Sequence, residues 1–374
     1  MTLAATWYDV AVIGAGPAGA ATARWLADQG CRVLLVERSR FDAPRVGESL
    51  APGVQPLLRD LGVWDRFVAL GSVPSWGTRS VWGEAVPQEH SHLMSPYGCG
   101  WHVDRARFDG MLAEAAVEAG ATLTLGATLA SCREEGARWH LVLNEGERTR
   151  AVTAQVLVDG TGRGARVAQW LGARRDVFDG LVGMTGWFGE IDTAAHGFTL
   201  VEAEADGWWY SSPVGRNRLV AMLMTDADLA GRANLSELDA WKARLDAAPV
   251  TSARIASGAF AAGPRAFSAV SQRLRRRDRS ARWLAVGDAA LAVDPVSGSG
   301  VLRALRTAKA GAHTVLAMLD GDASAALAAY ETERDGECAS YLEERARYYA
   351  AEERWADALF WRRRASGQGE ATSQ

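Results

Sequence analysis

The feature that most constrains this chain is a glycine-rich turn near its start, between a predicted strand and a predicted helix. Residues 8–13 are mostly β-branched and apolar, which indicates a strand buried on both faces. In the GxGxxG pattern that follows, the first glycine allows a tight turn and the second lets a pyrophosphate approach the backbone. The third lets the next helix pack closely on the strand. The turn therefore predicts a phosphate-binding loop formed by Gly14, Gly16, Ala18 and Gly19.

A second predicted strand supplies the acid that this kind of loop requires. The helix from about Pro17 ends at Gln29-Gly30, and the strand 31–36 runs into Glu37. A carboxylate at this distance from the glycines can accept hydrogen bonds from the ribose of an adenine nucleotide. A lone GxGxxG also occurs in chance glycine-rich turns, but the complete strand–helix–strand pattern favours dinucleotide binding. Arg38 is an adjacent candidate contact to the cofactor.

Composition excludes several other classes of function. The chain has 374 residues, of which 48% are hydrophobic, and is long enough for two interleaved domains or for one domain with a substantial insertion. Its formal net charge of −4 gives no overall basic field, so neither a nucleic-acid partner nor a membrane partner is expected. The first strand leaves no room for a signal peptide, which predicts a cytoplasmic protein. Four scattered cysteines and six histidines predict neither disulfides nor a metal site.

Two segments after the second strand carry candidate catalytic residues. The sequence VGESL lies in a glycine-bearing loop that can reach the reactive end of a cofactor, so Glu48 is a candidate acid or base. The alternative is that Glu48 caps the next helix or pairs with an arginine. Further on, Asp104 is a good N-cap for a helix. Just before and after it lie His102, a second catalytic candidate, and Arg105, which either contacts the cofactor or is simply solvated.

Two later motifs are expected to return the chain to the cofactor. The sequence DGTGR follows a predicted strand, and its acid and glycine, Asp159 and Gly160, suit a second approach of the backbone to the cofactor. A strand at 283–286 then leads into GDAALAVDPVSGSG and a helix. The candidate cofactor residues of this last stretch are Asp288, Pro295, Gly298 and Gly300.

Aromatic residues are concentrated in two other parts of the chain. Residues 181–225 predict an antiparallel sheet that contains Trp208 and Trp209. Such rings can floor a pocket for a planar substrate or pack the sheet against helices. The same two explanations, a docking surface or simple packing, apply to aromatic residues of the predicted C-terminal helix at about 334–364. These are Tyr348, Tyr349, Trp355 and Trp361.

The order of these motifs resembles that of flavoprotein monooxygenases with the glutathione-reductase-type nucleotide fold, over nearly the whole chain. The early GxGxxG with Glu37, the middle DGTGR and the late GD that precedes Pro295 form the FAD-binding set of that family. The resemblance implies noncovalent FAD, with Asp288 at the ribityl chain and the last helix directed at the flavin ring. Arg163 stands where the phenol-hydroxylase form has serine, which weakens the inference that NADPH docks and reduces the flavin directly.

Within this superfamily the chain is most similar to the tryptophan-halogenase-like branch, above all to flavoproteins needed to build tryptophylquinone cofactors. The stretches VGESL, GTRSVWG, GWHVDRARFD, GWWYSSP and EERWADALFWRRR carry this resemblance. The halogenase motif WxWxIP is altered, because Tyr210 and Ser212 replace its second tryptophan and its isoleucine. The lysine that halogenases need after the GES loop is also missing, and Arg79 is the nearest cation there.

The resemblance implies an FAD-dependent monooxygenase. Reduced flavin and oxygen would form a C4a-hydroperoxide that hydroxylates an electron-rich ring such as an indole, either free or as a tryptophan in a peptide or protein. Electrons would come from a nicotinamide cofactor or from a separate flavin reductase. Halogenation of an aromatic substrate and a non-catalytic, FAD-binding maturation chaperone are the alternatives.

The expected fold is α/β: a Rossmann FAD-binding domain with a parallel sheet and an antiparallel crossover, an antiparallel substrate domain and C-terminal helices. The FAD-binding domain is expected to combine 1–72, 101–175 and 272–325. The substrate domain would combine 73–100 and 176–271, and 326–366 would form the helical region.

Overall fold

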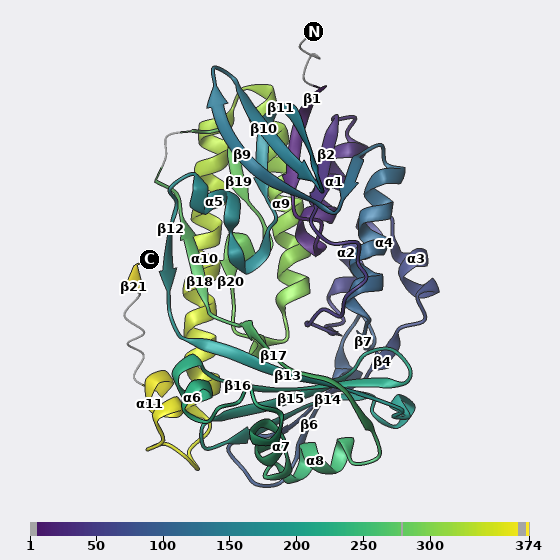
Figure 1. Cartoon of the computed structure of the whole chain (residues 1–374), viewed down its shortest axis with the longest axis vertical. Helices are drawn as coiled ribbons and strands as arrows, with labels where there is room; N and C mark the ends of the chain where they lie inside the picture. Colours follow the sequence, from purple (N-terminus) through teal and green to yellow (C-terminus); the bar gives the residue numbers. More distant parts are fainter. Residues whose placement is uncertain (1–5, 278–279, 366–371, 374) are drawn as a thin grey trace.

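A mainly parallel sheet forms the centre of one half of the computed structural model, which describes residues 6–277, 280–365 and 372–373 (Figure 1). Its strands are β1 (Thr6–Ile13), β2 (Val33–Glu37), β8 (Thr122–Leu125), β9 (Ala127–Glu135), β10 (Arg138–Glu145), β11 (Arg148–Asp159) and β19 (Trp283–Ala285). The order is β8-β2-β1-β11-β10-β9, and β19 also pairs with β11. Strand β10 pairs antiparallel with both β9 and β11, and these three strands form the expected crossover.

Both faces of the parallel strands are buried, and the sequence of β1 is accordingly a continuous apolar run. Val10 and Val12 face helices α1 (Pro17–Asp28), α4 (Arg105–Glu118) and α9 (Gly300–Asp320), whereas Ala11 faces the side that β9 and β10 cover. The many alanines of α1 let it pack closely between the other two helices. As expected, Asp104 caps α4, because its carboxylate accepts a 3.0 Å hydrogen bond from the amide of Ala106. Two short helices, α2 (Val54–Asp60) and α3 (Trp64–Ala69), precede this layer.

A second, mostly antiparallel sheet lies against the first unit in the order β17-β13-β16-β15-β14-β5-β6. Its strands are β5 (Gly77–Val81), β6 (Gln88–Ser91), β13 (Leu181–Gly189), β14 (Phe198–Glu204), β15 (Gly207–Pro213), β16 (Arg218–Asp226) and β17 (Ala259–Ser268). Its strands come from the two segments expected to form the substrate domain, although the exact domain boundaries stay a prediction.

A small three-stranded sheet brings the loop around Glu48 next to the segment that carries His102. Strand β7 (Gly100–His102) pairs antiparallel with β3 (Ser49–Leu50) and with β4 (Val73–Ser75). Ser49 consequently lies directly opposite His102. A further sheet contains β12 (Arg174–Val177), β18 (Gln272–Arg275), β20 (Leu291–Ala292) and β21 (Thr372–Ser373).

The adjacent rings Trp208 and Trp209 pack the second sheet on its two faces. Trp208 contacts Trp82 edge-on, while Trp209 contacts Trp241 of α7 (Leu238–Asp246). Neither ring is exposed to solvent, so of the two explanations for these tryptophans, packing holds and a pocket floor does not. The other helices that flank the sheets are α5 (Arg166–Trp170), α6 (Ala227–Arg232) and α8 (Pro249–Ile255).

The C-terminal helices differ from the sequence prediction. A single helix α10 (Ala323–Ala350) runs past both sheets, and α11 (Leu359–Ala365) folds back onto the second sheet (Figure 1). The predicted helix 334–364 is therefore wrong across 351–358. Glu352 is buried just after the end of α10, and its carboxylate accepts a 2.7 Å hydrogen bond from the amide of Gly83. The predicted fold class is confirmed, and no helix among the described residues is long and apolar enough to cross a membrane.

Candidate active site

The glycine-rich loop leaves open space at only one of its three glycines. A Cβ added to Gly14 would lie 2.4 Å from the carbonyl oxygen of Gly160, and one added to Gly19 would lie 1.9 Å from that of Gly14. Both glycines are therefore required by close backbone packing. A Cβ added to Gly16 meets no atom within 4 Å, although this residue stands at the N-terminus of α1. Gly16 thus faces a space where the positive end of the helix dipole favours an anion, as a pyrophosphate requires.

Glu37 lies at the end of β2 beside this loop, as expected. Its Oε2 accepts a 2.8 Å hydrogen bond from the amide of Ala15, and its Oε1 accepts hydrogen bonds from the amide and hydroxyl of Ser39. Burial raises the pKa of Glu37, but the hydrogen bonds from Ser39 and Ala15 outweigh this effect and keep its pKa below the ordinary value. The group is therefore a carboxylate at neutral pH and can accept a ribose hydroxyl. Arg38 beside it is exposed.

Asp159 and Gly160 support the first loop from β11. The Asp159 carboxylate accepts hydrogen bonds from the amide and hydroxyl of Thr161 and from the amide of Ala168, so it braces its own turn. The amide of Gly160 donates a 2.8 Å hydrogen bond to Ile13, and this residue packs against Gly14. Their observed partners are thus protein groups, and a direct contact with the cofactor stays a prediction.

The late motif forms a second open glycine turn at the N-terminus of α9. Pro295 begins a short 3₁₀ turn, and Gly298 has a left-handed φ of +58°. A Cβ added to Gly298 or to Gly300 meets no atom within 4 Å. Asp288 is half-buried nearby, where its carboxylate lies 3.4 Å from Nε of Arg163. The open glycine turns at the starts of α1 and α9 fit a long dinucleotide such as FAD, which supplies the redox chemistry when bound.

Arg105 connects the Glu48 loop to α4. Its guanidinium forms an ion pair with Asp109, at 2.9 Å from Nε to Oδ1, and donates a 2.8 Å hydrogen bond to the carbonyl of Val46. Burial lowers the pKa of Arg105, but the charge of Asp109, followed by those of Glu48 and Asp288, raises it above its ordinary value. The arginine is therefore bound by protein groups and lies close enough to Glu48 and Asp288 to feel their charges. Its contact with the cofactor stays a prediction.

Glu48 is fully buried and faces the second sheet. Burial raises the pKa of Glu48 to about 7, although the charge of Arg105 lowers it in part. Its Oε2 lies 3.5 Å from the hydroxyl of Tyr210, and its Oε1 makes no hydrogen bond of ordinary geometry with the described residues. A buried carboxyl group that titrates near neutrality and has an unsatisfied oxygen is suited to acid–base chemistry on a ligand.

A cluster of buried hydroxyl groups links Glu48 to His102. The hydroxyl of Ser49 lies 2.9 Å from that of Tyr210, and the hydroxyl of Ser212 lies 2.9 Å from Nδ1 of His102. Burial lowers the pKa of His102 to about 3, helped by the charge of Arg254. His102 is therefore neutral at physiological pH. Its Nε2 makes no hydrogen bond of ordinary geometry with the described residues. The hydroxyl cluster consists of Ser49, Thr199, Tyr210 and Ser212.

Sequence reasoning placed Glu48 and His102 among the site residues but missed the hydroxyl groups between them. Tyr210 and Ser212 do carry a signal, since they occupy the two altered positions of the halogenase motif. Thr199 carries none, because only the pairing of β14 with β15 brings it to the cluster. Arg254 on α8 was missed as well; burial lowers its pKa to about 10, and its guanidinium donates a 2.7 Å hydrogen bond to the carbonyl of Phe198.

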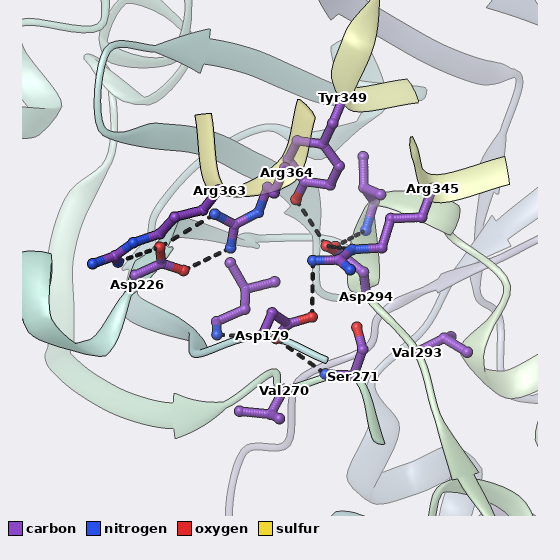
Figure 2. A network of polar contacts seen from close by, with 12 residues as sticks. Asp179, Asp226, Val270, Ser271, Val293, Asp294, Arg345, Tyr349, Arg363 and Arg364 are labelled. Atoms are coloured by element: carbon purple, nitrogen blue, oxygen red, sulfur yellow. Dashed lines mark hydrogen bonds and ion pairs between the residues drawn. The ribbon is translucent and has the colours of Figure 1, made fainter. Parts of the chain in front are cut away.

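Tyr349 of α10 ties the second sheet to the turn before α9. Its hydroxyl donates a 2.8 Å hydrogen bond to Oδ2 of Asp294 (Figure 2). The same hydroxyl accepts a 3.0 Å hydrogen bond from Nε1 of Trp208. Asp294 in turn caps the 3₁₀ turn that Pro295 begins. Arg345 pairs with Asp294 and Asp179, and Arg364 of α11 pairs with Asp226 of β16. The C-terminal helices therefore clamp both halves of the site. Of the four aromatic residues considered for a docking surface, Tyr349 and Trp361 are buried and pack the helices, whereas Tyr348 is exposed and Trp355 is partly buried, so a docking role of the last two stays a prediction.

The open glycine turns at the N-termini of α1 and α9, with the Glu37 carboxylate beside the first, are the features of an FAD-binding protein. The chain matches the model of the FAD binding domain family over residues 7–344, and it belongs to that family. No group of three or more potential metal ligands occurs among the residues that the structure describes.

Three proteins show where the chain stands relative to known flavoproteins. LodB of Marinomonas mediterranea, named as an FAD-dependent oxidoreductase, is 30% identical over 364 residues, which cover 96% of each chain. The structure of the myxobacterial chondrochloren halogenase CndH is similar, with a TM-score of 0.88 and 26% identity over 96% of this chain and 86% of that chain. The peptidyl tryptophan dihydroxylase QhpG shares the fold, with a TM-score of 0.74 and 24% identity over 96% of this chain and 79% of the other. The resemblance to flavin monooxygenases of the halogenase-like branch is thereby confirmed, as is FAD as the cofactor.

Proposed function

We propose that this protein is an FAD-dependent monooxygenase that hydroxylates an electron-rich aromatic ring, preferably an indole, either free or as a tryptophan in a peptide or protein. One atom of O₂ enters a ring C–H bond, and the other leaves as water with two electrons and two protons. The electrons arrive through FAD from a nicotinamide cofactor or from a separate flavin reductase. The chain's own residues hold the ring and exclude water.

The observation that carries this proposal is the lack of a lysine at the site. A lysine can carry halogen as a haloamine, whereas an arginine is held cationic and cannot easily do so. The chain has only two lysines: Lys309 forms an ion pair with Asp60, and Lys242 lies over the ring of Phe260. Neither contacts the hydroxyl cluster. Arg79, the candidate replacement, forms a half-exposed ion pair with Glu89 on the adjacent strand.

The altered halogenase motif supports the same proposal. Tyr210 and Ser212 contribute buried hydroxyl groups where halogenases carry tryptophan and isoleucine. The resulting polar lining can hold a donor such as the N–H of an indole and can pass a proton toward Glu48. QhpG, whose name describes hydroxylation of a peptidyl tryptophan, is a precedent for this chemistry on the same fold.

Halogenation is the second candidate, because CndH is a halogenase with a very similar structure. Hydroxylation and halogenation are distinguished by incubating the enzyme with reduced FAD, oxygen, an indole substrate and chloride or bromide. We expect products that have gained oxygen and none that carries halogen, as read by mass spectrometry. A product with a chlorine or bromine isotope pattern would overturn the proposal. A protein that binds a tryptophan-containing partner but yields neither product would instead be a maturation chaperone.

A further inference from the structure

A groove rich in arginine opens on the surface at chain segments that also lead to the hydroxyl cluster. It encloses about 580 Å³ between the end of α3, the start of α4 and the turn from β15 to β16. Two of its lining residues lie on the same chain segments as the cluster, since Val214 follows Ser212 by two residues and Asp104 follows His102 by two. The residues that line the groove are Leu70, Gly71, Asp104, Arg107, Val214, Gly215, Arg216, Asn217 and Arg218.

The charge of the groove is opposite to that of the whole chain. Three exposed arginines, Arg107, Arg216 and Arg218, line it, together with a single acid. That acid, Asp104, forms a 2.7 Å ion pair with Arg218. The charges of Arg107 and Arg216 are therefore not neutralised by an acid of the lining. Glu190 and Asp192 lie on the segment whose backbone bonds to the same turn, but neither lines the groove. A local excess of positive charge on a chain of net charge −4 favours an anionic ligand.

We infer that this groove binds an acidic peptide segment of a protein that carries the aromatic substrate. Guanidinium groups bind carboxylates in a bidentate manner, and the Asn217 amide can both donate to and accept from a peptide backbone. A phosphate fits less well, because the first-turn amides of α4 already donate to the Asp104 carboxylate, which also repels a phosphate. Leu70 and Val214 provide apolar contacts for the peptide side chains.

This inference rests on the proposed function in its peptide or protein form, because the groove would hold the chain on either side of the reacting tryptophan. The peptide would enter the site along the segments that carry Ser212 and His102. The groove then selects substrates by the charge that flanks the tryptophan, and a free indole does not need it.

The test uses the protein loaded with oxidised FAD, so that binding is measured without turnover. Two short fluorescein-labelled peptides contain one tryptophan, flanked by Asp and Glu in one and by Asn and Gln in the other. We expect the acidic peptide to bind about tenfold more tightly by fluorescence anisotropy, with an advantage that shrinks at high salt. The variant Arg107→Glu/Arg216→Glu should abolish this advantage and retain FAD. The control Arg133→Glu/Arg148→Glu makes the same change of charge on β9 and β11 and should leave the advantage intact.

Equal binding of both peptides, or equal losses in the groove variant and in the control, would overturn the inference. So would inorganic phosphate or NADPH binding in place of the peptide with the same dependence on Arg107 and Arg216, because the groove would then be a small-anion site. Hydroxylation of a free indole without peptide binding would overturn only this inference. Peptide binding without any oxygenated product would overturn only the proposed function.

Discussion

The hydroxyl of Tyr349 lies 2.8 Å from Oδ2 of Asp294, and this hydrogen bond fixes the C-terminal helix to the turn that precedes α9. The same hydroxyl accepts the indole N–H of Trp208 from the second sheet. One oxygen atom therefore joins three segments that are distant in the sequence. Because all three groups are buried, none can replace a lost hydrogen bond with water.

Tyr349→Phe should destabilise the fold by about 1–3 kcal/mol, because it leaves the indole N–H of Trp208 and one oxygen of Asp294 without this partner. The measurement is the midpoint of thermal unfolding of the FAD-loaded protein. Tyr348→Phe is the control, since the neighbouring Tyr348 side chain is half-exposed, and its midpoint should not change. Equal midpoints for Tyr349→Phe and the unaltered protein would show that the hydroxyl has no clamping role.

Gly16→Val should remove FAD and leave the protein folded. The valine side chain would fill the space that the glycine turn leaves open, while nothing within 4 Å opposes its Cβ. The measurement is the flavin-to-protein ratio after gel filtration, with circular dichroism as the test of folding. Gly19→Val should instead lose the fold, because its Cβ would lie 1.9 Å from the carbonyl oxygen of Gly14. Retention of stoichiometric FAD by Gly16→Val would disprove the assignment of the phosphate site.

The contribution of Glu48 to stability should fall as pH rises from about 4.5 to about 7. Burial raises its pKa from 4.5 to about 7, so between these values the folded protein holds a proton that the unfolded chain releases. The stability contributed by protonated Glu48 is therefore complete below pH 4.5 and is lost as pH rises toward 7, by roughly 3 kcal/mol. In Glu48→Gln this loss should disappear, which urea unfolding at pH 5 and pH 8 would measure. His102→Gln should instead make the fall steeper, because burial lowers the pKa of His102 from 6.5 to about 3, so between these values the unfolded chain binds a proton that the folded protein lacks, and the stability from this group rises with pH.

Tyr210→Phe should raise the pKa of Glu48 above 7, since the hydroxyl of Tyr210 stabilises the charged carboxylate. The midpoint of the pH profile of hydroxylation should move upward with it, while the FAD content stays the same. An unchanged midpoint would mean that Glu48 and Tyr210 do not interact in the working enzyme, or that another group controls the profile.

The nucleotide half of this structure was predictable from the sequence because its signals are local. The apolar run of β1, the glycines after it and Glu37 lie within one stretch of chain, and backbone packing requires two of those glycines. The hydroxyl cluster was not predictable, because Ser49, Thr199 and Ser212 become neighbours only through pairing of β3 with β7 and of β14 with β15. The end of α10 was missed for a similar reason, since Glu352 leaves the helix to bind a distant amide.

The contact between Gly14 and Gly160 also implies an order of assembly. The first loop is complete only when β11 has docked beside β1 and the backbone of Gly160 has closed on it. The ribosome synthesises β11 well after α1. The nascent chain therefore cannot form the complete phosphate-binding loop while only its first segments have left the ribosome. Cofactor capture must therefore follow long-range pairing of the sheet, and an N-terminal fragment that stops before Arg148 should bind no flavin nucleotide, however well its first helix forms.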